Sequence, residues 1–171
     1  MTRRPTTSRP GRTWPLWVAA AAVWVAKPAA AQEAGWGVGS IRLRSDRSVA
    51  ETLDRLESLA KEKGLKVFAR IDHAGGAATV GVELPPTQLL IFGSPRVGAP
   101  LMRCDREVGL DLPMKALAWK DAEGGVWLTV TDPAALTRNH DLDDCADVLA
   151  RARAGVLALA RAAAAVDSGR P

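Results

Sequence analysis

Two segments with helical periodicity lie far apart in the chain, and the apolar runs between them have the pattern of strands. Residues 49–63 carry an apolar stripe, and Ser48 and Glu51 stand at its start with the spacing of a capping box. Residues 141–166 carry a second stripe, rich in alanine, whose small side chains suit close packing on a sheet. We therefore predict an α+β fold in which helices pack on one face of an antiparallel sheet.

Five segments have the pattern of strands. The first two alternate apolar and polar side chains, which is the period of a half-buried strand. The third is a continuous apolar run, typical of a buried central strand, and the last two flank a polar, glycine-containing loop, as in a hairpin. Helical inserts are expected around residues 98–103 and, as an option, at 74–80. The five segments are residues 40–44, 65–72, 88–92, 115–120 and 126–131.

The predicted hairpin places two tryptophans opposite each other. A five-residue loop at 121–125 pairs Trp119 with Trp127 on one side of the sheet, and the other side carries small and β-branched residues that suit the last helix. Because no helix is predicted over the tryptophans, we expect an apolar patch and a homodimer through this face. The alternative is that the insert near residues 98–103, or the lead-in with Trp36, covers them within one subunit.

The first 31 residues predict a removable export signal. They combine a basic start that holds no acid, an apolar run at residues 14–26, and small residues before Gln32. The run is shorter than the roughly 20 residues that a membrane-spanning helix needs. We therefore expect cleavage after Ala31, no membrane association after signal removal, and a periplasmic or secreted location; a retained anchor is the alternative.

Loss of this signal changes the charge balance. The signal holds five of the 23 Lys and Arg residues, so its removal leaves 18 basic against 19 acidic residues. Without an excess of positive charge, binding to nucleic acid lacks its main electrostatic driving force, and nucleic acid is not an expected partner. The remaining 140 residues suit a single domain. We place that domain at residues 39–166, between a flexible lead-in at 32–38 and a tail at 167–171.

Two cysteines, Cys104 and Cys145, remain in the exported part. An oxidising compartment favours a disulfide between them, whereas Cys145 on the apolar stripe also suits a free, buried thiol. No Cys-x-x-Cys motif occurs, so neither thioredoxin-like exchange nor covalent haem attachment is predicted. We expect no cofactor.

Four stretches together resemble the domain of unknown function 302 family, over about residues 37–159. The resemblance implies a TATA-box-binding-protein-like fold of the order β-α-β4-α, which agrees with the order predicted from periodicity. It implies no established activity, substrate or catalytic residue. The stretches read FARIDHA at residues 68–74, LLIFGSP at 89–95, GAPLM at 98–102 and DLPMKALAW at 111–119.

The segment at residues 92–100 is the most unusual in composition. Two glycines allow a close backbone approach, two prolines stiffen its path, and Arg96 is its only charge. Arg96 with exposed amides can hold a carboxylate or another small anion, whereas the alternative is a rigid connector. The candidate ligand-binding residues are His73, Phe92, Gly93, Ser94, Arg96 and Met102.

His73 follows Asp72 at the end of a predicted strand, which raises the alternative of an enzyme or a copper-handling protein that uses His73 and residues 92–102. Neighbours in a strand point to opposite faces, so Asp72 and His73 are not expected to bond to each other, and a role of His73 in capping or bracing the glycine-rich loop is favoured. Catalytic residues therefore stay unassigned, no metal site is predicted, and we expect a non-catalytic module for ligand binding or association. The soft side chains that copper would need are His73, Met102, Cys104, Met114 and His140.

Overall fold

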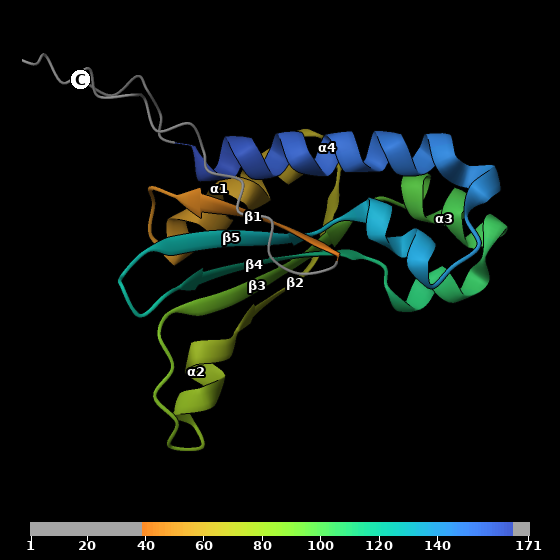
Figure 1. Ribbon diagram of the computed structural model, residues 1–171. Helices are drawn as coiled ribbons and strands as arrows, with labels where there is room; N and C mark the ends of the chain where they lie inside the picture. The colour runs from red at the N-terminus through yellow and green to blue at the C-terminus, as the bar shows by residue number, and fades with distance from the viewer. Residues whose placement is uncertain (1–38, 166–171) are drawn as a thin grey trace, which may run out of the picture.

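The computed structural model describes residues 39–165, which form one five-stranded antiparallel sheet with helices (Figure 1). The strand order is β1-β5-β4-β3-β2, and the predicted α+β class is confirmed. The strands are β1 (Ser40–Ser45), β2 (Lys66–Asp72), β3 (Thr87–Gly93), β4 (Met114–Lys120) and β5 (Val126–Thr131). The helices are α1 (Val49–Glu62), α2 (His73–Ala78), α3 (Pro95–Cys104) and α4 (Ala146–Ala164), with short 3-10 turns η1 (Arg106–Leu110), η2 (Pro133–Arg138) and η3 (Asp143–Cys145).

Helices α1 and α4 cover the same face of the sheet, whereas α2 projects away from it and α3 lies beside the first turns of α4 (Figure 1). The core lies between these two helices and the sheet, because alternate strand residues point inward there. Ala116 and Ala118 of β4 are fully buried, and their small side chains let the helices approach closely. The largest side chains of this core are Leu43, Leu53, Leu56, Leu90, Phe92 and Leu128.

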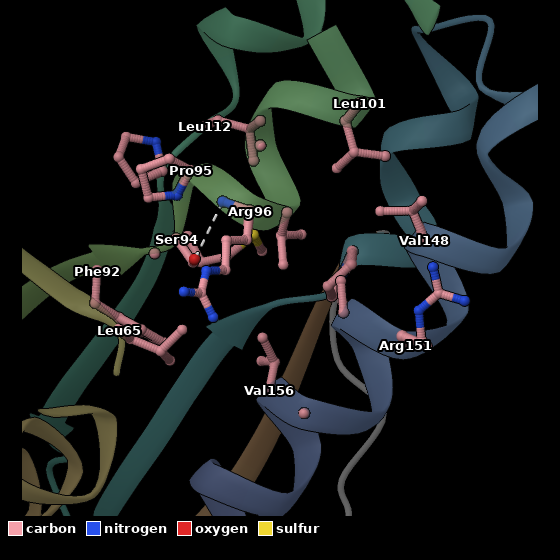
Figure 2. Close-up of a pocket in the computed structure, with 18 of the residues that line it drawn as sticks. Leu65, Phe92, Ser94, Pro95, Arg96, Leu101, Leu112, Val148, Arg151 and Val156 are labelled. Atoms are coloured by element: carbon pink, nitrogen blue, oxygen red, sulfur yellow. Dashed lines mark hydrogen bonds between the residues drawn. The ribbon is translucent and has the colours of Figure 1, made fainter. Parts of the chain in front are cut away.

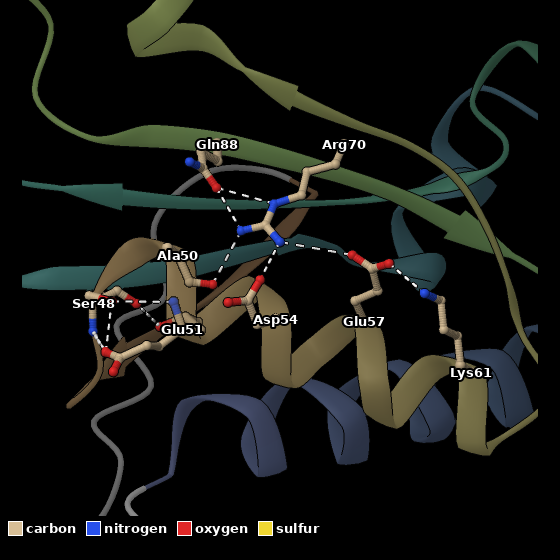
Figure 3. A network of polar contacts seen from close by, with 9 residues as sticks. Ser48, Ala50, Glu51, Asp54, Glu57, Lys61, Arg70 and Gln88 are labelled. Atoms are coloured by element: carbon tan, nitrogen blue, oxygen red, sulfur yellow. Dashed lines mark hydrogen bonds and ion pairs between the residues drawn. The ribbon is translucent and has the colours of Figure 1, made fainter.

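Helix α1 begins as the sequence predicts. The Ser48 hydroxyl accepts a hydrogen bond from the backbone N–H of Glu51, and the Glu51 carboxylate accepts one from the backbone N–H of Ser48, at 3.0 Å (Figure 3). This reciprocal pair satisfies two of the amides that a helix start leaves without partners. At the other end, Gly64 has a φ of +72°, a left-handed conformation that lets the chain turn into β2.

A single arginine ties the edge strand β2 to α1 (Figure 3). The Arg70 guanidinium pairs with Asp54, donates to the carbonyl of Ala50 at 3.2 Å and lies 3.9 Å from a Glu57 oxygen. It also donates to the Gln88 side chain on β3 at 2.8 Å. Arg70 thereby fixes β2 against a helix and against its neighbouring strand at once.

The hairpin has the predicted register, with Trp119 opposite Trp127. The expectation of bare indoles is wrong, because β1 pairs with β5 and brings Arg42 over both rings, 4.9 Å from the Trp119 centroid and 5.8 Å from that of Trp127. The indole N–H groups donate to Thr129 at 3.2 Å and to Asp121 at 2.6 Å. Both long helices lie on the opposite face, and the predicted alternative cover, α3, packs against α4 and η1 instead.

Two helix boundaries differ from the prediction. Residues 95–104 form one continuous helix and not a loop with a shorter insert, because Pro95 occupies the first helical position and the Ser94 side chain caps it. The last helix starts at Ala146 and not at 141, because Leu142 turns into a second apolar cluster beside Leu101. The predicted signal, lead-in and tail fall within residues 1–38 and 166–171, which lie outside the described range.

Candidate functional site

A cavity of about 820 Å³ opens between the C-terminal end of α1, the start of α3, the middle of α4 and the end of β3 (Figure 2). Its lining is almost wholly apolar. Volumes of about 300–1,000 Å³ are typical of sites for small organic ligands. The lining includes Leu59, Leu65, Phe92, Val97, Leu101, Leu112, Val148, Val156 and Leu159.

The end of β3 forms one wall because the chain passes there from strand to helix. Phe92 is the last core side chain of β3, and Gly93 then brings the backbone so close to Pro113 that a Cβ at Gly93 would lie 3.3 Å from the Pro113 Cβ. Ser94 follows as the cap of α3, and Arg96 stands in the first turn. The close approach at Gly93 therefore sets the direction in which α3 and Arg96 leave the sheet.

Small residues of α4 make the opposite wall. Ala152, Gly155 and Ala162 line the cavity together with larger apolar residues of the same helix. A Cβ added at Gly155 would meet no atom within 4 Å, so the space beside it is open. The alanine-rich stripe that the sequence assigned to sheet packing thus also leaves room for a ligand.

Five of the six predicted ligand-binding residues line this cavity: Phe92, Gly93, Ser94, Arg96 and Met102. His73 is not among the lining residues. The register explains why, since Lys66 lies opposite Gly93 whereas Asp72 lies opposite Gln88, at the other end of the hairpin formed by β2 and β3. His73 starts α2 there, so the two parts of the predicted enzyme or metal site do not converge.

The amides expected to be exposed near Arg96 are occupied. The backbone N–H of Arg96 donates to the Ser94 hydroxyl at 3.2 Å. The next two amides, of Val97 and Gly98, donate to the Ser94 carbonyl at 3.0 and 2.9 Å. The sequence predicted that Arg96 and exposed amides would bind an anion together. Because these amides are bonded within the first turn of a helix, only the Arg96 side chain of that predicted set is left to bind an anion.

Sequence reasoning did not select two further cations at the cavity, Lys63 and Arg151. Lys63 follows the last residue of α1, and Arg151 lies on α4 one turn after Val148. Each stands among exposed charged residues of an amphipathic helix, so no local pattern distinguishes it from a solvated surface charge. Only the packing of α1, α3 and α4 brings them to one rim.

A disulfide joins Cys104, the last residue of α3, to Cys145, just before α4. Cys104 is therefore unable to serve as a thiolate ligand, which removes it from the soft ligand set considered for copper. Among residues 39–165, no group of three or more His, Cys, Asp or Glu side chains is arranged to hold a metal ion. The disulfide instead ties the end of α3 to the residue before α4.

His140 lies between two carboxylates, one of which belongs to Asp105, the residue after Cys104. Its Nε2 atom is 2.7 Å from Asp111, and its Nδ1 atom is 3.4 Å from Asp105, with only 6% of the side chain exposed. The hydrogen bond with Asp111 raises the pKa of His140 above its ordinary value, and burial opposes that shift. The backbone N–H of Glu107 holds the pKa of Asp105 below its ordinary value. His140 thus links the two carboxylates and favours its protonated form more than a free imidazole does.

Asp72 has a structural role at the start of α2. Its carboxylate accepts a hydrogen bond from the backbone N–H of Gly75 at 3.0 Å and caps α2. The glycine-rich segment after β2 is thus braced by Asp72, and His73 stands exposed beside it.

None of the helices within residues 39–165 combines the length and the apolar character required to cross a membrane. Curated relatives include "Fluoride-specific ion channel FluC 1" of Brucella suis and "Fluoride-specific ion channel FluC 2" of Brucella melitensis, each 50% identical over 114 residues. The match covers 67% of this chain but only 45% and 42% of those proteins. The chain therefore spans less than half the length of these relatives.

A crystal structure of an uncharacterized conserved DUF302 protein from Bacillus stearothermophilus shares the fold, with a TM-score of 0.60 and 18% sequence identity. The similarity covers 75% of this chain and 97% of that one. The model of the family "Domain of unknown function DUF302" matches residues 41–159, and on that match the chain belongs to the DUF302 family.

Proposed function

We propose that this domain is a non-catalytic binding module that holds a small, mainly apolar ligand in the cavity beside α3 and α4. The observation that carries the proposal is the cavity itself, about 820 Å³ of apolar-lined space within one chain. Burial of apolar ligand surface there is favourable by roughly 25 cal/mol per Å² before the costs of association. Its few polar groups suit orientation of a ligand rather than catalysis.

The test is titration with N-phenyl-1-naphthylamine, a neutral apolar dye whose fluorescence increases in apolar surroundings. We expect saturable binding at one site per chain. Gly155→Leu should weaken binding about tenfold or more, because the new side chain enters space that is open beside α4. The same substitution at Gly76, on the distant α2 and also with no atom within 4 Å of an added Cβ, is the matched control. Absence of saturable dye binding, or equal binding by both variants, contradicts the proposal.

We further infer that the module works outside the cytoplasm, in a periplasmic or secreted location. The composition of residues 1–31 supports an export signal, and a Cys104–Cys145 disulfide suits an oxidising compartment. Intact mass of the protein recovered from the cell envelope should lack residues 1–31. A species that retains Met1 and stays in the membrane fraction would contradict export by cleavage.

A second candidate role is association with a fluoride-specific channel. It is favoured by 50% identity to part of proteins that bear that name. Deletion of the coding sequence in the source organism should then increase growth inhibition by sodium fluoride but not by equal sodium chloride. Equal growth of both strains at every fluoride concentration would argue against this role without affecting the cavity proposal.

A further inference from the structure

The charges around the cavity all have the same sign. The lining contains Lys63, Arg96 and Arg151, and no Asp or Glu among the described residues contributes to it. The three cations come from the residue after α1, from α3 and from α4, so the tertiary fold and not one basic helix brings them together. An apolar cavity with a purely cationic rim complements an amphiphile that carries a negative charge.

These three cations are also free to receive a ligand. None of them forms an ion pair or a side-chain hydrogen bond with another residue in the part of the chain that the structure describes. Other exposed arginines of the fold are used structurally, as Arg70 is with Asp54 and Arg153 is with Asp132. The cationic rim is therefore available charge rather than part of the internal ion-pair network.

Arg96 is the best placed of the three. Figure 2 shows its side chain extending from the start of α3 toward the space between Leu65 and Val156, both of which line the cavity. Its planar guanidinium offers several N–H donors that match a carboxylate or a phosphate. The Ser94 hydroxyl lies at the same helix start, where it accepts from the Arg96 amide and keeps its own hydrogen for donation.

We propose that the ligand is an amphiphile with a hydrocarbon chain in the cavity and a terminal oxyanion, carboxylate or phosphate monoester, that pairs with Arg96. Lys63 and Arg151 add to the positive potential at the rim. This inference rests on the proposed binding function and names the class of ligand. Under this inference the protein selects its ligand by the charged head group as well as by the apolar chain.

The test is displacement of N-phenyl-1-naphthylamine from the full chain as recovered from cells. The competitors share one chain length and differ in head group: decanoate, decyl phosphate, 1-decanol and decyltrimethylammonium. We expect the anions to displace the dye at concentrations about tenfold lower than 1-decanol, as charge-assisted hydrogen bonds allow, and the cation to be weakest. The stronger of the two anions identifies the head group as carboxylate or phosphate.

Arg96→Gln should abolish the preference for the anions while the neutral dye still binds. Arg103→Gln is the matched control, because Arg103 lies in the last turn of the same helix and does not line the cavity. Equal displacement by decanoate and 1-decanol in the unmodified protein, or an anion preference that survives Arg96→Gln, would overturn the inference and leave the proposed function in place. Failure of the dye itself to bind would reject both.

Discussion

Individual residues in this fold often serve two structures at once. Arg42 of β1 lies opposite Thr129 of β5, and its side chain also lies over two indole rings, those of Trp119 on β4 and Trp127 on β5. Gly93 ends β3 beside Pro113, and a side chain at Gly93 would make a tight contact there, with its Cβ 3.3 Å from the Pro113 Cβ. His140 links Asp111 of the turn after η1 to Asp105 at the end of α3, and so helps hold the region that closes the cavity.

The pairing of His140 predicts a pH dependence of stability. Its pKa is raised in the folded state, so protonated His140 contributes stability that is fully present below about pH 6.5, its ordinary value, and is lost as the pH rises through the folded-state pKa. The thermal midpoint of unfolding should therefore decrease as the pH rises through the folded-state pKa of His140. In the His140→Gln variant this decrease should be smaller. His73→Gln, at the exposed start of α2, is the control that should keep it. Parallel pH profiles for the wild type and His140→Gln would refute this assignment.

At the scale of elements, α3 is held in place by few long-range contacts. Its last residue, Cys104, is joined to Cys145, and the second apolar cluster packs Leu101 against Leu142 and Leu149. Because α3 carries Ser94 and Arg96 at its other end, the bond that anchors its last turn also supports the geometry of the candidate site.

Removal of the disulfide should lower the free energy of unfolding. The bond closes a loop of 41 residues, which corresponds to about 4 kcal/mol in the chain-entropy model. Cys104→Ser combined with Cys145→Ser should show a loss of this order in urea denaturation. Reductant should destabilise the wild type by a similar amount and leave the double variant unchanged. If reductant has no effect on the wild type, the bond does not contribute to stability in solution.

At the scale of the whole molecule, the two faces of the sheet differ. One is covered by α1 and α4, and the other carries the tryptophan pair, over which no helix lies within residues 39–165. Ile71 of β2 is also an exposed large apolar residue, at 39%. The homodimer that the sequence predicts through this face stays a prediction, with Arg42 and Arg44 stacked on the indoles as part of the surface involved.

Trp127→Glu tests that prediction. In a dimer formed through the open face, it would bury a carboxylate in the interface, so sedimentation should change from dimer to monomer while the circular dichroism stays that of a folded chain. Trp127→Phe keeps an apolar aromatic ring, although a smaller one without the N–H that donates to Asp121, and should remain dimeric. A monomeric wild type would refute the homodimer, and a dimeric, folded Trp127→Glu variant would place its interface elsewhere.

The sequence by itself determined the order of the elements and the local devices that start and stop them. Periodicity identified every strand, the capping box at Ser48 and the hairpin register of Trp119 and Trp127, because these depend on residues close together in the chain. It also selected five residues that line the cavity, since residues 92–102, which include the unusual segment 92–100, form one wall.

Tertiary structure alone decided what surrounds that wall. Lys63 and Arg151 reach the same rim only because α1 and α4 pack side by side on one face, and neither carries a local signal of that meeting. His73 does not line the cavity, because antiparallel pairing of β2 with β3 places it at the opposite end of this strand pair from Gly93. The boundary of α4 was likewise set by contacts of Leu142 and Cys145 with α3, since long-range burial outweighs helix propensity.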